Sequence, residues 1–242
     1  MSDLNGWTPR ERLAGWTPRE RPARAAIEGR YVRLEPLDPQ RHGDGLYAAS
    51  RTADADDRFR WLFETAPDDR AAFQAWLEKV AASEDPLHFA VIDKASGRVG
   101  GRQSLMRIDT THGVIEIGNI LWNDPVARRP AATEALYLFA RHAFDTLGYR
   151  RFEWKCNDLN APSKRAALRF GFTFEGVFRQ HMVVKGLNRD TAWFAIVDKD
   201  WPVIRAAFEA WLAPENFDAQ GGQKARLEDI KAAIAAKQDG AG

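Results

Sequence analysis

A strand, a helix and a second strand follow one another between residues 114 and 156, and this unit constrains the fold more than any other feature. Residues 114–122 have the composition and alternation of a strand. Residues 133–147 repeat apolar side chains at helical spacing and stop before Gly148, a residue suited to capping a helix. Residues 151–156 form a further strand pattern. Such a unit predicts one parallel crossover in the sheet.

Antiparallel strands and further helices surround this unit. The sequence predicts an antiparallel meander, a long hairpin and four flanking helices, in the order βααβββαβαββ with one more helix after the last strand. The expected segments are a strand at 31–35, a short helix at 45–51, a helix that Asp68 caps and that ends before Pro86, strands at 88–93 and 98–108, a short helix at 162–170, hairpin strands at 172–185 and 189–197 turning at 186–188, and a helix at 203–212. This order is an α/β arrangement.

Composition excludes several classes of protein. The chain has 242 residues, 45% hydrophobic and 29% charged, with a net charge of +1 and one cysteine. The hydrophobic content predicts a globular core, and a single cysteine excludes an intramolecular disulfide. The near-neutral net charge does not favour a broad nucleic-acid-binding face. The first residues lack the basic start and apolar run of a secretory signal, and no stretch is apolar enough to span a bilayer. We therefore expect a cytoplasmic protein that does not insert into a membrane.

The two ends of the chain differ from the middle. The heptapeptide Gly-Trp-Thr-Pro-Arg-Glu-Arg occurs at residues 6–12 and again at 15–21, which is too short a repeat for a solenoid. We expect residues 1–25 to be a flexible arm and residues 26–213 to form the folded domain. Residues 214–242 are expected to be a linker followed by a helix over 224–237.

The loop between the first strand of the crossover and its helix favours an anion site. A helix N-terminus presents free N–H groups and partial positive charge. Arg128 and Arg129 add positive charge there, and the small side chains of Ala131 and Ala132 allow close backbone approach. The loop carries neither GxxxxGK[ST] nor GxGxxG, so a nucleoside triphosphate or dinucleotide site is not supported.

Three motifs together resemble the GNAT acyl-CoA N-acetyltransferase superfamily. They are EIGNILW at 116–122, ARRPAATEA at 127–135, and NAPS at 160–163 with FGF at 170–172. The resemblance covers roughly residues 27–212 and is strongest to the RimJ/RimL-type branch, the ribosomal-protein alanine N-acetyltransferases. It implies a mixed, mostly antiparallel sheet with a splayed central parallel pair, flanked by helices.

The resemblance also implies where acetyl-CoA binds. Main-chain groups of Ile120, Leu121 and Trp122 would bond the pantetheine arm, as would Asn160. The pyrophosphate would lie on the loop at 127–132 and the helix start at Thr133, where Arg128, Arg129, Ala131 and Ala132 follow the family pattern. Ala127 and Pro130 depart from that pattern, and Pro130 removes one N–H from it. Proline is nevertheless well suited to the first position of a helix.

Two side chains are candidates for proton transfer. Glu116 shares a strand face with Gly118 and Ile120, and a carboxylate there could take the proton of the amine directly or through water. Its alternative role is a hydrogen-bonded structural carboxylate. Family members often carry the acid for the leaving thiolate as a tyrosine, a position that Ala167 holds here. Ser163 lies one helical turn earlier and is the replacement we expect, although NAPS could also be only a helix start.

Five side chains are expected to face the acceptor, on the first helices and the last hairpin: Trp61, Phe63, Arg179, His181 and Trp193. Arg179 and His181 alternate onto one strand face, where a cation could hold an anionic group of the acceptor. His181 could instead be a second base or have a structural role. No His or Cys stands at metal-ligand spacing around Cys156, so no metal is expected.

The predicted activity is transfer of acetyl from acetyl-CoA to a primary amine, a protein N-terminus or a small amino compound, in a ternary complex. One alternative is a non-catalytic acyl-CoA-binding module, which the changes at Ala127, Pro130 and Ala167 suggest. Another is a ribosome-associated or RNA-associated protein that acts through the Trp and Arg residues of the arm. We expect a monomer or a homodimer.

Overall fold

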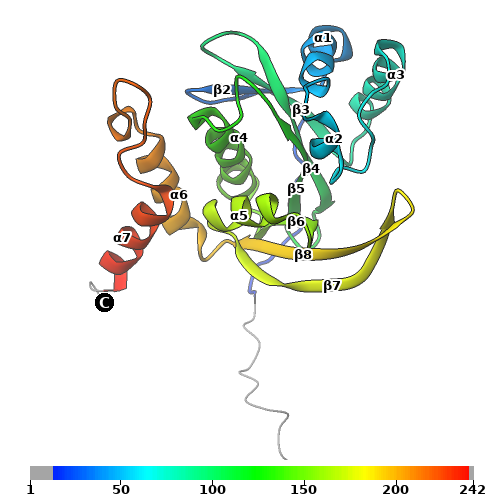
Figure 1. Ribbon diagram of the computed structural model, residues 1–242. Helices are drawn as coiled ribbons and strands as arrows, with labels where there is room; N and C mark the ends of the chain where they lie inside the picture. Colours follow the sequence, from blue (N-terminus) through cyan, green and yellow to red (C-terminus); the bar gives the residue numbers. More distant parts are fainter. Residues whose placement is uncertain (1–12, 240–242) are drawn as a thin grey trace, which may run out of the picture.

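A single eight-stranded sheet forms the centre of the protein (Figure 1). The structure is a computed structural model, and it describes residues 13–239. The strands lie in the order β1-β2-β3-β4-β5-β6-β8-β7. Their bounds are β1 Ile27–Glu28, β2 Val32–Pro36, β3 Leu87–Asp93, β4 Val99–Asp109, β5 Val114–Trp122, β6 Arg151–Asn157, β7 Thr173–Val184 and β8 Leu187–Val197.

Helices cover both faces of this sheet. In Figure 1, α1 and α3 lie together beside β3, while α4 lies on the other side of the sheet. The bounds are α1 Pro39–Ser50, α2 Ala55–Phe59, α3 Arg70–Ala81, α4 Pro130–Arg141, the π-turn η1 His142–Thr146, α5 Ala161–Arg169, α6 Trp201–Leu212, the 3-10 turn η2 Pro214–Asn216 and α7 Leu227–Asp239. Among the helices within residues 13–239, none is both long and apolar enough to cross a membrane.

The parallel crossover is where the sequence predicts it. Every paired neighbour in the sheet is antiparallel except β5 and β6. Their pairing runs only from Val114 to Ile117 on β5, opposite Arg151 to Trp154 on β6. Beyond Ile117 the two strands are no longer paired, so they splay. The predicted α/β fold with a splayed parallel pair is confirmed.

Alternation along β3 divides the apolar interior in two. Phe89 and Val91 belong to the main core, which α4, α6 and the central strands share. Ala90 and Ile92 face the opposite way, into a smaller core with residues of α1 and α3. Successive side chains of a strand point to opposite faces, so one strand can serve both cores.

Several helix boundaries differ from those predicted. The helix expected at 45–51 begins at Pro39, because the Asp38 side chain accepts from the backbone N–H groups of Gln40 and Arg41. The five-residue α2 was not predicted, and Asp69 rather than Asp68 caps α3. The apolar repeat shows the helical face well, but the cap decides where each helix begins.

The central helix also starts earlier than its apolar repeat. Pro130 occupies the first turn of α4, where the expected start is residue 133. The carboxylate of Glu134 accepts from the backbone N–H groups of Arg30, Tyr31 and Val32 at 2.7, 2.6 and 2.8 Å. This buried side chain therefore joins α4 to the turn between β1 and β2.

The second copy of the heptapeptide lies against the domain. Trp16 Nε1 donates to the carbonyl of Thr111 at 3.0 Å, and Arg19 Nε donates to the carbonyl of Gly148 at 2.9 Å. The Arg19 guanidinium stacks on the Trp16 ring at 4.2 Å. The first copy, at 6–12, lies outside the described residues. The segment that follows residue 13 is thus tied to the loops before β5 and β6.

Candidate active site

A groove opens where β5 leaves β6. Its walls come from α2 and the loop after it, β4, β5, the loop before α4, β6, α5 and β8. The pairing of β5 with β6 ends at Ile117, and the lining of the groove includes the β5 residues that follow. The splay is therefore the structural cause of the groove.

The β5 wall contains the three residues expected to bond the pantetheine arm. Ile120, Leu121 and Trp122 all line the groove. The carbonyl of Trp122 already accepts from Nη1 of Arg58 at 2.8 Å, and the indole N–H of Trp122 donates to Gln103 at 3.1 Å. Arg58, from α2, also lines the groove. One expected main-chain acceptor thus has a partner within the protein.

The loop before α4 forms one end of the groove. Ala127 and Arg128 line it, and Arg128 is exposed with a left-handed φ of 60°. Arg129 is the N-cap residue of α4 and lies 3.3 Å from Asp124. Two positive side chains therefore flank the start of this helix.

The remaining loop candidates are buried at the helix start. Ala131, Ala132 and Thr133 are 3%, 7% and 3% exposed and do not line the groove. The Thr133 hydroxyl accepts from Nη1 of Arg169 at 3.1 Å. These three residues would therefore contact a cofactor through their backbone groups rather than through their side chains.

Ser163 lies in the opposite wall with its hydroxyl oriented by a neighbour. Trp154 Nε1 donates to Ser163 Oγ at 3.0 Å. Burial raises the pKa of the adjacent Cys156 thiol, and a hydrogen bond from Ser163 acts in the opposite direction. The serine hydroxyl therefore accepts from the indole and faces a sulfur atom inside the groove. Asn160 also lines the groove, and its side chain caps α5 by accepting from the Ser163 N–H at 3.1 Å.

Glu116 lies at the point where the two strands part, within a network of ion pairs. Its carboxylate is buried and accepts from Nη1 of Arg107 at 2.8 Å. Lys155 Nζ lies 3.0 Å from Glu116 and 2.6 Å from Glu153. The same ammonium lies 3.8 Å from the centre of the Trp193 ring. Glu116 thus faces the groove with two cations already bound to it.

The expected acceptor residues are only partly brought together. Trp61 and Phe63 line the groove. Trp193 and His181 stand beside its lining, in a cluster with Phe178 in which the rings of Phe178 and Trp193 are 4.4 Å apart. His181 Nδ1 is 3.0 Å from Thr191 Oγ1, and burial with nearby Arg107 lowers the pKa of His181.

Arg179 does not reach the groove. It lines a separate shallow depression with Gln180, Asn188 and Asp190. The pairing of β7 with β8 shifts register between Phe178 and Met182, and Gln180 has a left-handed φ of 50°. The expected alternation of Arg179 with His181 requires a regular strand, and this bulge interrupts it.

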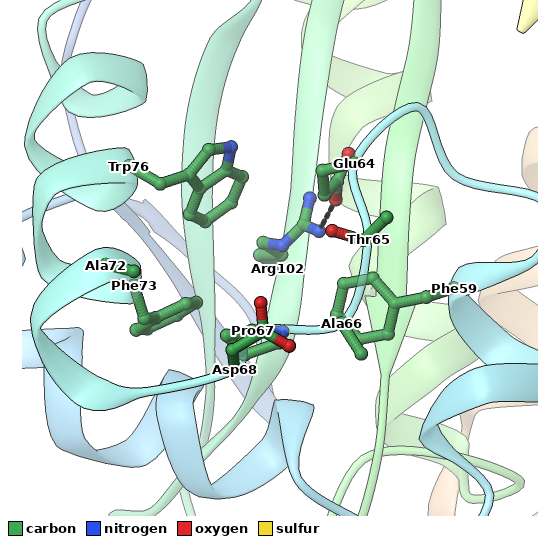
Figure 2. Close-up of a pocket in the computed structure, with 10 residues that line it drawn as sticks. All are labelled: Phe59, Glu64, Thr65, Ala66, Pro67, Asp68, Ala72, Phe73, Trp76 and Arg102. Carbon is green, nitrogen blue, oxygen red and sulfur yellow. Dashed lines mark hydrogen bonds and ion pairs between the residues drawn. The ribbon is translucent and has the colours of Figure 1, made fainter. Parts of the chain in front are cut away.

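A second cavity lies between α2, α3 and β4 (Figure 2). The aromatic rings of Phe59, Phe73 and Trp76 surround it, and Arg102 projects into it from β4. The Arg102 guanidinium forms an ion pair with Glu64 and lies 4.9 Å from the centre of the Trp76 ring. Its charge is therefore neutralised within the protein.

Several groove residues were not predicted from the sequence, among them Arg58, Arg107, Trp154, Lys155 and Arg189. Arg189 could have been predicted, because it lies four residues before Trp193 on the same strand and residues four apart on a strand share a face. Trp193 was already expected to face the acceptor. Trp154 had no such signal, since its contact with Ser163 depends on how α5 packs against β6. Within the described part of the chain, no group of three or more His, Cys, Asp or Glu is placed to hold a metal ion.

The family follows from this fold and from direct comparison. The protein-family model described as the acetyltransferase (GNAT) domain matches residues 32–173, which is more than half of the chain. The chain therefore belongs to the GNAT family and is an N-acetyltransferase of that family.

Individual relatives agree with this placement. A crystal structure of a GCN5-related N-acetyltransferase from Brucella melitensis is 62% identical, with a TM-score of 0.90, covering 91% of this chain and 100% of that one. The probable N-acetyltransferase YjcK of Bacillus subtilis is 24% identical over 72% of this chain and 98% of its own length. The microcin C7 self-immunity acetyltransferase MccE, solved with acetyl-CoA and AMP, is 20% identical over 70% of this chain and 93% of its own length, with a TM-score of 0.62, and shares the fold.

Proposed function

We propose that the protein transfers an acetyl group from acetyl-CoA to a primary amine, with both substrates bound in the splay of β5 and β6. The pairing of β5 with β6 stops at Ile117, and both Glu116 and Ser163 line the groove that opens there. This observation carries the proposal. The amine nitrogen attacks the thioester carbonyl, a C–N bond forms, and the C–S bond breaks. The amine loses a proton, and the coenzyme A thiolate gains one.

The groove suits acetyl-CoA in its charge and its shape. Arg128 and Arg129 flank the start of α4, where a pyrophosphate would also meet the positive end of the helix dipole. The unpaired part of β5, at Ile120 and Leu121, would bond the pantetheine arm. Asn160 completes the opposite wall. Pro130 fits the first turn of α4 without distortion, so its missing N–H does not close the site.

In this proposal Ser163 supplies the proton to the leaving thiolate. Its oxygen accepts from Trp154, and its own hydrogen, which faces Cys156, would turn to the sulfur of the leaving thiolate. Ser163 thereby takes the place of the tyrosine that Ala167 replaces.

Glu116 is the proposed proton acceptor, acting through water. Its carboxylate faces the groove, but Arg107 and Lys155 bind it at 2.8 and 3.0 Å. Such contacts orient a carboxylate, so the base role requires that a water molecule reach an oxygen between these cations. A purely structural role predicts that an amide at this position lowers turnover no more than the same change at Glu153, which also binds Lys155.

The proposed acceptor is a protein N-terminus or a small amino compound, the first of these in keeping with the RimJ/RimL-like resemblance. The test is a panel of amines with purified protein and acetyl-CoA, followed by release of free thiol and by mass of the acetylated product. Binding of acetyl-CoA without transfer to any member would favour the non-catalytic alternative. Deletion of residues 1–25 tests the ribosome or RNA alternative, which needs Trp16 and Arg19 free of their contacts with the domain.

A further inference from the structure

Arg189 is a buried cation in the wall of the groove. It lies on β8, is 7% exposed, and belongs to the lining of the groove beside Phe63. Its guanidinium carbon is 5.1 Å from the centre of the Phe63 ring. Burial lowers the pKa of this guanidinium, as does the nearby Arg107, while Cys156 and Glu116 act in the opposite direction. A buried charge of this kind is costly unless an anion accompanies it.

No carboxylate in residues 13–239 lies within ion-pair distance of Arg189. Within that range its side chain makes one hydrogen bond, from Nε to Thr191 Oγ1 at 3.3 Å, so both terminal nitrogens have no acceptor in this part of the chain. Two other arginines of the groove lining differ in this respect. Arg58 is paired with Asp54, and Arg107 is paired with Glu116.

The charges around Arg189 do not balance. Arg107 and Lys155 are bound to Glu116, Lys155 and Arg151 are bound to Glu153, and Arg151 also reaches Glu175. These contacts set three cations against three carboxylates, and Arg189 is the additional positive charge. The ion-pair network is therefore complete without it.

The place of Arg189 in the groove indicates which substrate carries the missing anion. Arg189 lines the same groove as Glu116 and Ser163, the two residues proposed to transfer protons. The phosphates of coenzyme A are assigned to the other end, at Arg128 and Arg129. The thioester itself has no negative charge. An anion at Arg189 therefore belongs to the acceptor.

We propose that Arg189 binds a carboxylate of the acceptor, which makes the substrate a small amino carboxylate. The planar fork of a guanidinium matches a carboxylate with two parallel hydrogen bonds, and both terminal nitrogens of Arg189 are free for them. The inference rests on the proposed function, because it assigns the acceptor of that same site.

The first experiment compares acceptors on the unaltered protein, so it does not depend on any variant folding. The value of kcat/KM is measured for α-amino acids and their carboxamides, for ω-amino carboxylates of increasing length, and for the corresponding aminophosphonates. Carboxylates are expected to exceed their carboxamides by roughly 10- to 100-fold, the range for hydrogen bonds to charged groups. Equal values, or preference for the phosphonates, would overturn the inference and leave the proposed function standing.

The second experiment assigns the preference to Arg189. In Arg189→Gln the ratio of carboxylate to carboxamide should fall close to one, and Arg189→Lys should keep part of it. Arg179→Gln is the matched comparison, because it makes the same change on the same hairpin outside the groove. Loss of the preference in Arg179→Gln instead, or an equal loss for all acceptors in Arg189→Gln, would overturn the assignment. Absence of transfer to any amine would overturn the proposed function, and the inference with it.

Discussion

Trp154 donates its indole N–H to the hydroxyl oxygen of Ser163, 3.0 Å away, across the interface between β6 and α5. This contact fixes the direction in which the serine hydrogen can point. Trp154 is 6% exposed and packs against Phe170 and Phe172, so the indole is held from behind. The position of the proposed acid therefore depends on the aromatic core.

The first prediction concerns this pair. Ser163→Ala should lower kcat by about 10²–10⁴-fold, the usual contribution of a general acid, with little change in acetyl-CoA affinity. Trp154→Phe keeps the packing but removes the donor, and it should lower kcat by a smaller factor. Steady-state kinetics and calorimetric titration with acetyl-CoA provide the two readouts.

A double-mutant cycle separates positioning from general destabilisation. If Trp154 acts through Ser163, adding Trp154→Phe to Ser163→Ala should have almost no further effect on kcat. Independent, multiplying losses would show that the indole supports the groove in some other way.

The second prediction concerns Glu116. If it accepts the amine proton, Glu116→Gln should reduce kcat by about 10²-fold or more. Glu153→Gln is the matched control, because Glu153 stands opposite Glu116 in the register and also binds Lys155. Equal losses in both variants would assign Glu116 to the ion-pair network instead.

The sequence predicts the sheet and the position of the groove better than the side chains in its wall. The apolar repeats and the crossover at 114–156 depend on local patterns, and these survive in the structure. Arg179 was expected at the groove but lies outside it, because a register shift between Phe178 and Met182 alters which side chains of β7 share a face. Irregular pairing of this kind has no reliable signal in a single sequence.

The third prediction concerns stability against acid. Burial lowers the pKa of His88 to about 4, with Arg102 and Arg24 acting in the same direction and Glu64 opposing them. The unfolded chain binds this proton near pH 6.5, so between about pH 6.5 and 4 it takes up a proton that the folded protein does not. The free energy of unfolding should therefore have its full value above pH 6.5 and be lower by roughly 3 kcal/mol at pH 4.

Denaturant unfolding at a series of pH values measures this loss. His88→Gln removes the titrating group, so the slope between pH 4 and 6.5 should become shallower whatever its effect at neutral pH. His112→Gln is the control, because His112 is exposed and its ring pairs with Asp109, the last residue of β4. An unchanged slope in His88→Gln would place the acid-sensitive group elsewhere.

The fourth prediction concerns the segment that begins at residue 13. Trp16 lies on the turn at Gly113, where any added Cβ would come within 2.5 Å of the indole, and Arg150 stacks on the same ring at 5.5 Å. Gly113 and Arg150 precede β5 and β6, at the end where these strands are paired. Removal of residues 1–25 should therefore lower the melting temperature by about 5–10 °C, as expected for a loss of 2–3 kcal/mol in a domain of this size.

Truncation of residues 1–12 alone is the matched control, since the contacts of Trp16, Arg19 and Glu20 with the domain all lie beyond it. Trp16→Ala in the full chain should reproduce much of the larger loss, because one substitution removes the stacking on Arg19 and the hydrogen bond to Thr111. The β5–β6 pairing below the splay holds the two walls of the groove, so acetyl-CoA affinity should fall together with stability. A shorter chain that melts at the same temperature and binds acetyl-CoA equally well would show that this segment contributes nothing to holding the strands.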